Sequence, residues 1–200
     1  MYVQFRLAPR STGSGFPANM VQAQSNRPSP PAAPSLRRFL VLFLLLNLAG
    51  FGLLQWPAVE SVVTRFSALL VTVGAGLIRL FGGRVVNDQT ILRSVANGFS
   101  VLMMNGCNGI HVTVLWAAAV LAFPATWRRK AGGLVAGMAV IHALNLVRFL
   151  VLFYVGQSQS AWFDFLHVYA AESLMMFVTL ALFWLWAQTV LRAPSGLNAD

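Results

Sequence analysis

The sequence predicts an all-α polytopic membrane protein with about four transmembrane helices, an amphipathic interfacial helix and a short hairpin on the outer face. Of its 200 residues, 58% are hydrophobic and only 10% are charged, which leaves too few polar side chains to cover a soluble globule. Four apolar runs are each about long enough for a spanning helix, at about 20 residues per crossing. These runs are residues 39–55, 109–123, 132–155 and 168–190, of which the second is the shortest.

Basic residues gather at the ends of these runs and predict the orientation. With four spans, nine of them fall on one side, which the positive-inside rule makes cytoplasmic. These nine are Arg6, Arg10, Arg27, Arg37, Arg38, Arg128, Arg129, Lys130 and Arg192. The net charge of +9 does not indicate nucleic-acid binding, because the basic residues form no stripe and are not interleaved with aromatic side chains. We therefore expect both termini in the cytoplasm and no nucleic-acid partner.

Three regions are expected along the chain. Residues 1–36, rich in Ser, Pro, Gly, Gln and Asn, are predicted to form a disordered cytoplasmic tail. Residues 37–192 form the membrane-embedded domain, and residues 193–200 form a second cytoplasmic tail. The first apolar run resembles a signal sequence, but it lies too far from the start and lacks a small-x-small cleavage site, so we expect a retained anchor.

The segment 59–81 is long enough to span, yet Arg65 and Arg79 would be costly inside lipid. Its apolar residues follow one stripe at helical spacing, and its polar residues line up on the opposite face, which is the pattern of a helix lying in the interface. The stripe comprises Val62, Phe66, Leu69, Leu70, Val73, Leu77 and Leu80, and the polar face comprises Ser61, Arg65, Thr72 and Arg79. A flat helix places residues 82–106 outside, where turn residues and short β-branched runs predict a small hairpin.

Cys107 is the only cysteine and lies in "MNGCNGI", immediately before the second span on the outer side. Alone it makes no internal disulfide and no zinc site. At a helix N-terminus, free N–H groups and the helix dipole stabilise a thiolate and can receive an oxyanion. The sequence leaves two interpretations open, a small buried hydrophobe or a nucleophile.

Arg148 lies inside the third span, roughly 10 Å from its outer end at about 1.5 Å per residue. It either snorkels to the interface or has a function there. Asn145 and His142 precede it at three-residue steps and share one flank of the helix, which implies a neighbour other than lipid.

His167 ends the outer loop before the fourth span, at the expected depth of Cys107. It is either an interfacial histidine or an acid–base group. Asp164 is interpreted as a solvated loop residue. Glu172 is either a helix N-terminal carboxylate or an ion-pair partner of Arg148.

Together, "NGCNGI", "FPATWRRKAGG", "NLVRFLVLF" and "FLHVYAAESL" resemble the exosortase and archaeosortase family over about residues 60 to 190. The order of Cys, Asn-x-x-Arg and His on separate spans is typical of that family. The short chain and the "GCNG" form, with Asn108 where many members carry Ser, are most similar to exosortase H.

The resemblance implies a membrane-embedded cysteine endopeptidase or transpeptidase in the inner membrane of a Gram-negative bacterium, with its active site facing the periplasm. Its substrates would be exported proteins whose C-terminal sorting tail has a motif (IPTLxxWG-like or PEP-CTERM-like), a span and a basic end. Cys107 would be the nucleophile, Arg148 the oxyanion or thiolate stabiliser and His167 the general acid and base, with no cofactor or metal. Supporting roles are expected for Asn105, Asn108, Asn145 and Glu172.

Two other functions stay open from the residues alone. The chain could be a small ligand-binding transporter subunit in which Arg148 holds an anionic solute. It could also be a structural membrane scaffold in which His142, Asn145 and Arg148 join helices. The acceptor of the acyl group, water or a surface amine, is not determined by the sequence, and neither are the oligomeric state or the protonation states of Cys107 and His167.

Overall fold

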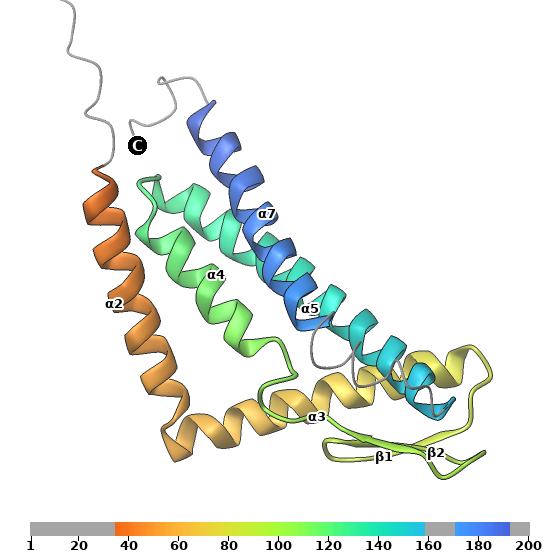
Figure 1. Ribbon diagram of the computed structural model, residues 1–200. Coiled ribbons are helices and arrows are strands. Elements are labelled where there is room, and N and C mark those ends of the chain that lie inside the picture. Colours follow the sequence, from red (N-terminus) through yellow and green to blue (C-terminus); the bar gives the residue numbers. More distant parts are fainter. Residues whose placement is uncertain (1–34, 159–170, 193–200) are drawn as a thin grey trace, which may run out of the picture. The chain divides into compact units, whose positions relative to one another are not determined.

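The computed structural model describes residues 35–158 and 171–192. The chain divides into two units, Met1–Ala33 and Pro34–Asp200, and the described residues belong to the second. Along the chain the elements are α2 (Leu36–Leu54), α3 (Pro57–Leu80), β1 (Val85–Asp88), β2 (Ile91–Ser94), β3 (Ser100–Leu102), α4 (Ile110–Ala122), α5 (Trp127–Gln157) and α7 (Ala171–Leu191) (Figure 1). The predicted tails lie outside the described residues, apart from positions 35 and 36.

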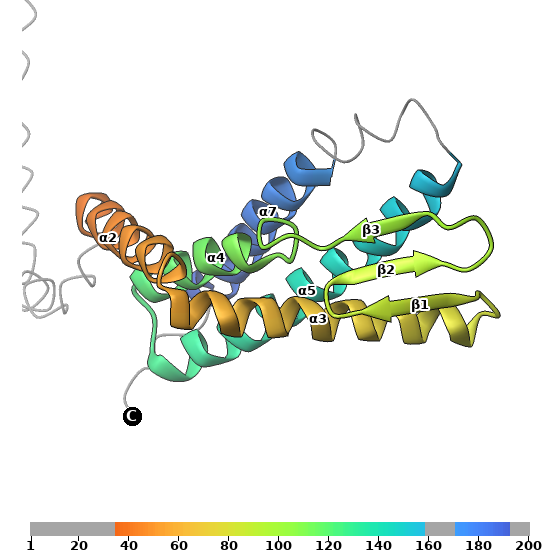
Figure 2. The same ribbon diagram turned by 90° about the horizontal axis from the view of Figure 1, so that it is seen from below.

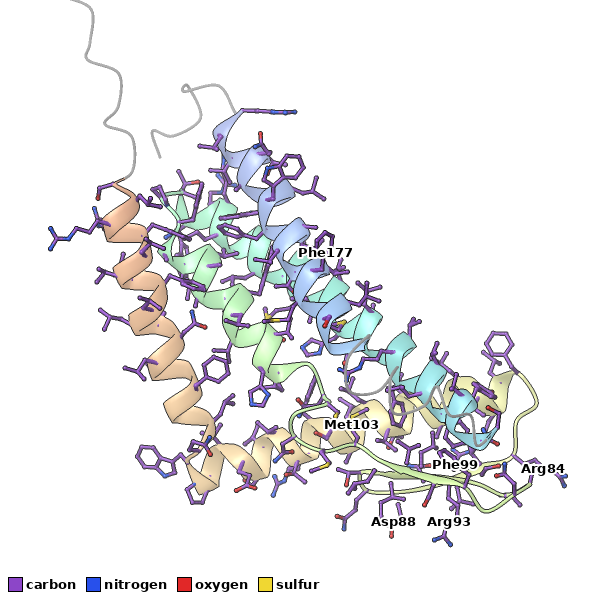
Figure 3. All side chains as sticks on the ribbon, viewed as in Figure 1. Arg84, Asp88, Arg93, Phe99, Met103 and Phe177 are labelled. Atoms are coloured by element: carbon purple, nitrogen blue, oxygen red, sulfur yellow. The ribbon has the colours of Figure 1, made fainter. Side chains whose placement is uncertain are left out.

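Among the described residues, four helices are long and apolar enough to cross a membrane: Leu36–Leu54, Pro57–Leu80, Trp127–Gln157 and Ser173–Leu191. Their outward side chains are apolar, as with Leu48 (74% exposed) and Phe177 (73% exposed; Figure 3). Lipid is the solvent that such a surface requires. The prediction of a mostly helical, polytopic membrane protein is therefore confirmed.

The four predicted spans correspond to α2, α4, α5 and α7, and α4 is the exception in length. It has 13 residues, about 20 Å at 1.5 Å per residue, which is less than the hydrocarbon core of a bilayer. It packs against α2, α5 and α7. Because α4 is shorter than a full span, the Cys107 loop at its N-terminus lies deeper than the end of a full-length spanning helix would.

Helix α3 runs crosswise to α2 and α4 (Figures 1 and 2). The corner is made at Trp56, which caps α3, with Pro57 in the first helical position where its missing N–H costs nothing. This course supports the predicted interfacial position, although α3 is long enough to span. The predicted stripe is divided in two: Leu70 is buried, whereas Val62 and Leu80 are 63% and 76% exposed.

The polar face of α3 binds the first strand. Arg79 donates hydrogen bonds from Nε and Nη2 to the carbonyl of Val85 (3.2 and 3.1 Å) and from Nη2 to Oδ1 of Asn87 (2.8 Å). Asn87 in turn donates to the hydroxyl of Thr72 at 3.3 Å. An arginine that would be costly in lipid is thus used to attach β1 to α3.

The predicted hairpin is present, with one more strand than expected. The three strands form an antiparallel sheet in the order β1-β2-β3, with Val85 opposite Ser94 and Ile91 opposite Leu102. The second turn contains Asn97 and Gly98, and Gly98 has φ +74°, a conformation that glycine adopts without strain. Asp88 and Arg93 point away from α3 (Figure 3).

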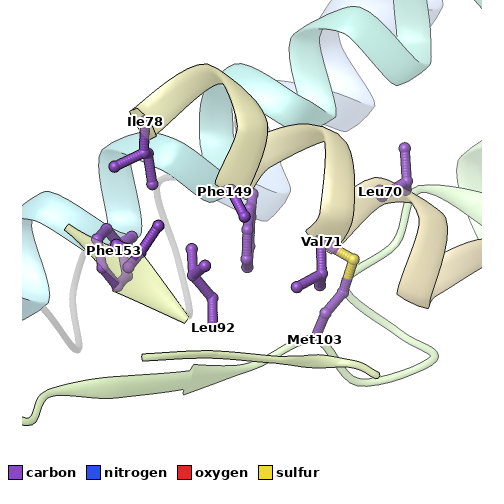
Figure 4. Packing of buried hydrophobic residues seen from close by; sticks show 9 residues of the cluster. Leu70, Val71, Ile78, Leu92, Met103, Phe149 and Phe153 are labelled. Carbon is purple, nitrogen blue, oxygen red and sulfur yellow. The ribbon is translucent and has the colours of Figure 1, made fainter. Parts of the chain in front are cut away.

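Two apolar clusters hold the described part together. The first joins α3, the sheet and the C-terminal half of α5, and consists of Leu70, Val71, Ala75, Ile78, Val85, Leu92, Met103, Phe149 and Phe153 (Figure 4). The second joins α4, α5 and α7 through Trp116, Val120, Ile141 and Met175. At Gly137 a Cβ atom would collide with the indole of Trp116, so the absent side chain makes room for that ring.

The basic turn before α5 binds the ends of its neighbours. Arg129 donates from Nη1 to the carbonyl of Val190 (3.1 Å), and Lys130 donates from Nζ to the carbonyl of Leu121 (2.5 Å). Both carbonyls lie in the last turn of a helix, where cations are favoured by the helix dipole. The start of α5 therefore lies beside the ends of α4 and α7, and the Cys107 loop lies at the opposite end of α4 (Figure 1).

Candidate functional site

The loop before α4 is fixed by a turn and by one buried asparagine. The N–H of Cys107 donates to the carbonyl of Met104 at 2.9 Å, which closes a four-residue turn. Asn108 is fully buried, donates from Nδ2 to the hydroxyl of Ser67 (2.9 Å) and accepts from the N–H of Ile110 at Oδ1 (3.0 Å). Cys107, half-buried and free, is thus held by its own backbone bond to Met104 and by the anchored Asn108 that follows it.

We expect Asn108→Ala to destabilise the fold, because it leaves the Ile110 N–H with no acceptor and removes the buried bond that the Ser67 hydroxyl accepts. The loss is about 2 kcal/mol, which corresponds to a melting temperature lower by about 4–8 °C. Thermal unfolding of the purified protein in detergent measures it. Asn105→Ala is the matched control, since the Asn105 side chain makes no hydrogen bond to any described residue. An equal loss in both variants would contradict the anchoring role of Asn108.

Gly109 brings this loop against α5. It adopts φ +81°, and a Cβ atom placed there would lie 3.3 Å from Cγ of Asn145. Asn145 is 1% exposed, and neither Nδ2 nor Oδ1 has a hydrogen-bond partner in the described part of the chain. A buried amide without a partner costs about 1–3 kcal/mol. Within the described residues, no hydrogen bond offsets the cost of burying this amide against the Cys107 loop.

Cys107 and Arg148 line the same cavity. It has a volume of about 20 Å³ and is otherwise lined by Val101, Leu102, Met103, Phe149 and Leu152. This is room for about one water molecule. Nε of Arg148 is buried and has no hydrogen-bond partner among the described residues. A thiol and a guanidinium, one from the loop and one from α5, therefore share this cavity.

His142 connects helices rather than lining this cavity. Its Nε2 lies 3.2 Å from the hydroxyl of Thr113 on α4, and its ring packs edge-on against Phe66 of α3, with centroids 4.9 Å apart. Thr113 gives its single hydroxyl hydrogen to the carbonyl of Gly109 (2.9 Å), so Nε2 of His142 is the donor in their bond. This contact is of the helix-joining kind that the scaffold interpretation expected of His142.

The remaining predicted residues fall outside this site or outside the described residues. His167 and Asp164 lie in the segment 159–170, which the structure does not describe. Glu172 belongs to the first turn of α7, and its side chain lies outside the described set, so its ion pair with Arg148 stays a prediction. Asn105 lines a different cavity, on the side of the loop toward α2 and α3.

Sequence reasoning did not find Ser67, the partner of Asn108. It is fully buried and also donates to the carbonyl of Val63 at 3.0 Å. The sequence did contain one signal for it: Ser67 lies three residues before Leu70 and therefore on the same, inward-packing face of α3.

Comparison with known proteins gives one match. The family model described as transmembrane exosortase matches residues 31–185 of this chain, which include the turn with Cys107 and the helix with Arg148. Among curated proteins and among solved structures, no match was found.

Proposed function

Because the chain belongs to the transmembrane exosortase family, we propose that it is a cysteine enzyme that cleaves the C-terminal sorting signal of exported proteins. Membership in this family supports a function in protein sorting. One observation carries the cysteine mechanism: the thiol of Cys107 and the guanidinium of Arg148, from a loop and from α5, line a single cavity.

In the proposed reaction the thiolate of Cys107 attacks the carbonyl carbon of the scissile peptide bond. A C–S bond forms and the carbonyl oxygen takes the negative charge. Arg148, which lines the same cavity as Cys107, is the group that stabilises this charge. The C–N bond then breaks, the tail leaves as an amine, and the protein stays bound as a thioester. His167, by family resemblance, gives the leaving amine its proton.

The proposed orientation puts this site at the outer face of the inner membrane. Arg129 and Lys130 lie at the end of the helices opposite the Cys107 loop, and Arg38 lies at the start of α2. The positive-inside rule assigns a basic end to the cytoplasm. A substrate anchored by its own span would present its motif at the other end, at the depth of Cys107. That motif is proposed to be IPTLxxWG-like or PEP-CTERM-like.

The test uses a reporter protein that carries a candidate tail, expressed with this enzyme in a bacterium that lacks a copy of its own. We expect a shorter reporter, cut at or near the motif, by intact mass. Neutral hydroxylamine added during the reaction should yield a reporter ending in a hydroxamate, because hydroxylamine intercepts thioesters. If no reporter is shortened with either motif, the sorting-enzyme proposal fails and the transporter and scaffold interpretations return.

A further inference from the structure

A second cavity lies on the other side of the Cys107 loop and is much larger. Its volume is about 250 Å³, and it is formed where α2 ends, α3 begins and α4 begins. It is lined by Leu54, Gln55, Glu60, Val63, Asn105, Ile110 and His111. A site of this size, outside the one already described, has room for a small polar molecule or a headgroup.

Four polar side chains line this cavity, of which Gln55, Glu60 and His111 are exposed and Asn105 is half-buried. Gln55, Glu60, Asn105 and His111 make no side-chain hydrogen bond or ion pair with any residue of the described segments. The ring of His111 is held by Phe51, with centroids 5.6 Å apart. A carboxylate, an imidazole and two amides, all unpaired and from different elements, form a donor and acceptor set that suits a ligand.

The charge of this cavity is opposite to that of the Cys107 cavity. Glu60 is one of two acidic side chains that the structure describes; the other, Asp88, is on the sheet and points away from α3 (Figure 3). The cavity shared with Cys107 contains Arg148 instead. The acidic cavity therefore suits a cation, and the basic one suits the thiolate and the oxyanion.

The two cavities share the turn that carries the nucleophile. Asn105 lines the acidic cavity, and Cys107 closes the same turn through its bond to the Met104 carbonyl. With about 3.8 Å between successive Cα atoms, the Cα atoms of Asn105 and Cys107 are at most about 7.6 Å apart. A molecule that contacts Asn105 in the acidic cavity therefore lies close to the turn that carries the nucleophile.

We propose that this cavity binds the acceptor of the acyl group and that the acceptor is a primary amine. The inference rests on the proposed function. Glu60 attracts the ammonium group, and the imidazole of His111 takes one of its protons. The amine nitrogen attacks the thioester carbonyl, a C–N bond forms, and the C–S bond breaks with its electron pair on sulfur. The second proton of the amine passes to that sulfur, so the products are an amide and the free thiol of Cys107.

Such an amine can come from a lipid headgroup or from a molecule in the aqueous phase. Helix α3, which bears Glu60 in its first turn, is the one predicted to lie in the interface, where headgroups are. The shared chemistry is the primary ammonium group. The two sources are separated by the composition of the vesicles used in the test.

The experiment reconstitutes the full chain in vesicles, adds a tail-bearing substrate and measures by mass the ratio of amide product to carboxylic acid product. One arm uses phosphatidylcholine vesicles with ethanolamine in solution, and the other uses vesicles that contain phosphatidylethanolamine. Wild type should give amide product in at least one arm. Glu60→Gln should lower the ratio about fivefold, from loss of an exposed ion pair. His111→Asn should lower it about 10²-fold, from loss of a general base.

The matched control is Asp88→Asn, which makes the same charge change on the sheet and should leave the ratio within about twofold. The ratio is taken within one reaction, so partial loss of active protein does not alter it. Cleavage that gives only the acid in both arms overturns the acceptor site and leaves the sorting function intact. So does an unchanged ratio in Glu60→Gln and His111→Asn. Absence of any cleavage overturns the proposed function, and the acceptor site with it.

Discussion

Replacement of Cys107 by alanine is expected to abolish cleavage of the sorting tail. Without the sulfur no thioester forms, and loss of the nucleophile in a covalent protease lowers kcat on the order of 10⁵- to 10⁶-fold. The loop should keep its position, because Cys107 uses its backbone N–H in the turn and Asn108 supplies the buried anchor. The measurement is single-turnover cleavage of a tail peptide by purified enzyme in vesicles.

Cys107→Ser serves as the matched variant, since it keeps the size and the polarity of the side chain. Its hydroxyl is far less ionised than a thiol near neutral pH, so its rate should also fall by several orders of magnitude. Both variants should melt within about 2 °C of wild type, because no side-chain bond is lost. A fall of less than tenfold in Cys107→Ala, at equal abundance, would remove Cys107 as the nucleophile.

The membrane helices could be predicted from hydrophobicity and charge, because lipid imposes a length and excludes charge. An interfacial position of α3 was predicted from the cost of Arg65 and Arg79 in lipid and from the apolar stripe opposite its polar face. The sequence pattern did not predict that Arg79 would hydrogen-bond to the carbonyl of Val85, which lies on β1 six residues later. The third strand was missed although Asn97-Gly98 is a strong turn signal.

For the site, predicting that Cys107 and Arg148 share a membrane depth required only topology, and the structure places both on one cavity. The contact of Asn108 with Ser67 spans 41 residues, and no local pattern specifies such a pair. The acidic cavity with Glu60 and His111 forms at a corner between helices, so its residues are far apart in sequence. The site was therefore predictable in its chemical groups and not in the contacts that hold them.

The second large effect is expected at Arg148. Arg148→Ala should lower kcat about 10²- to 10³-fold, the usual loss when one oxyanion donor is removed, with KM nearly unchanged. Arg148→Lys should recover part of that loss, because an ammonium keeps the charge and loses the fork of donors. Initial rates over a range of tail-peptide concentrations separate kcat from KM. Arg93→Ala is the control, since Arg93 lies on the sheet and points away from α3 (Figure 3).

The same variants separate catalysis from a purely structural role. If Arg148 only joined helices, its removal would lower the abundance and the melting temperature of the protein. Arg148 makes no hydrogen bond with the described residues through its buried Nε, so its removal should leave the melting temperature equal or higher. Arg148 is half-buried, and burying its Nε without a partner among the described residues is a cost to the fold, of the kind that is often kept where a group acts on a substrate. Unchanged kcat in Arg148→Ala, together with a lower melting temperature, would reject the catalytic role and favour the scaffold interpretation.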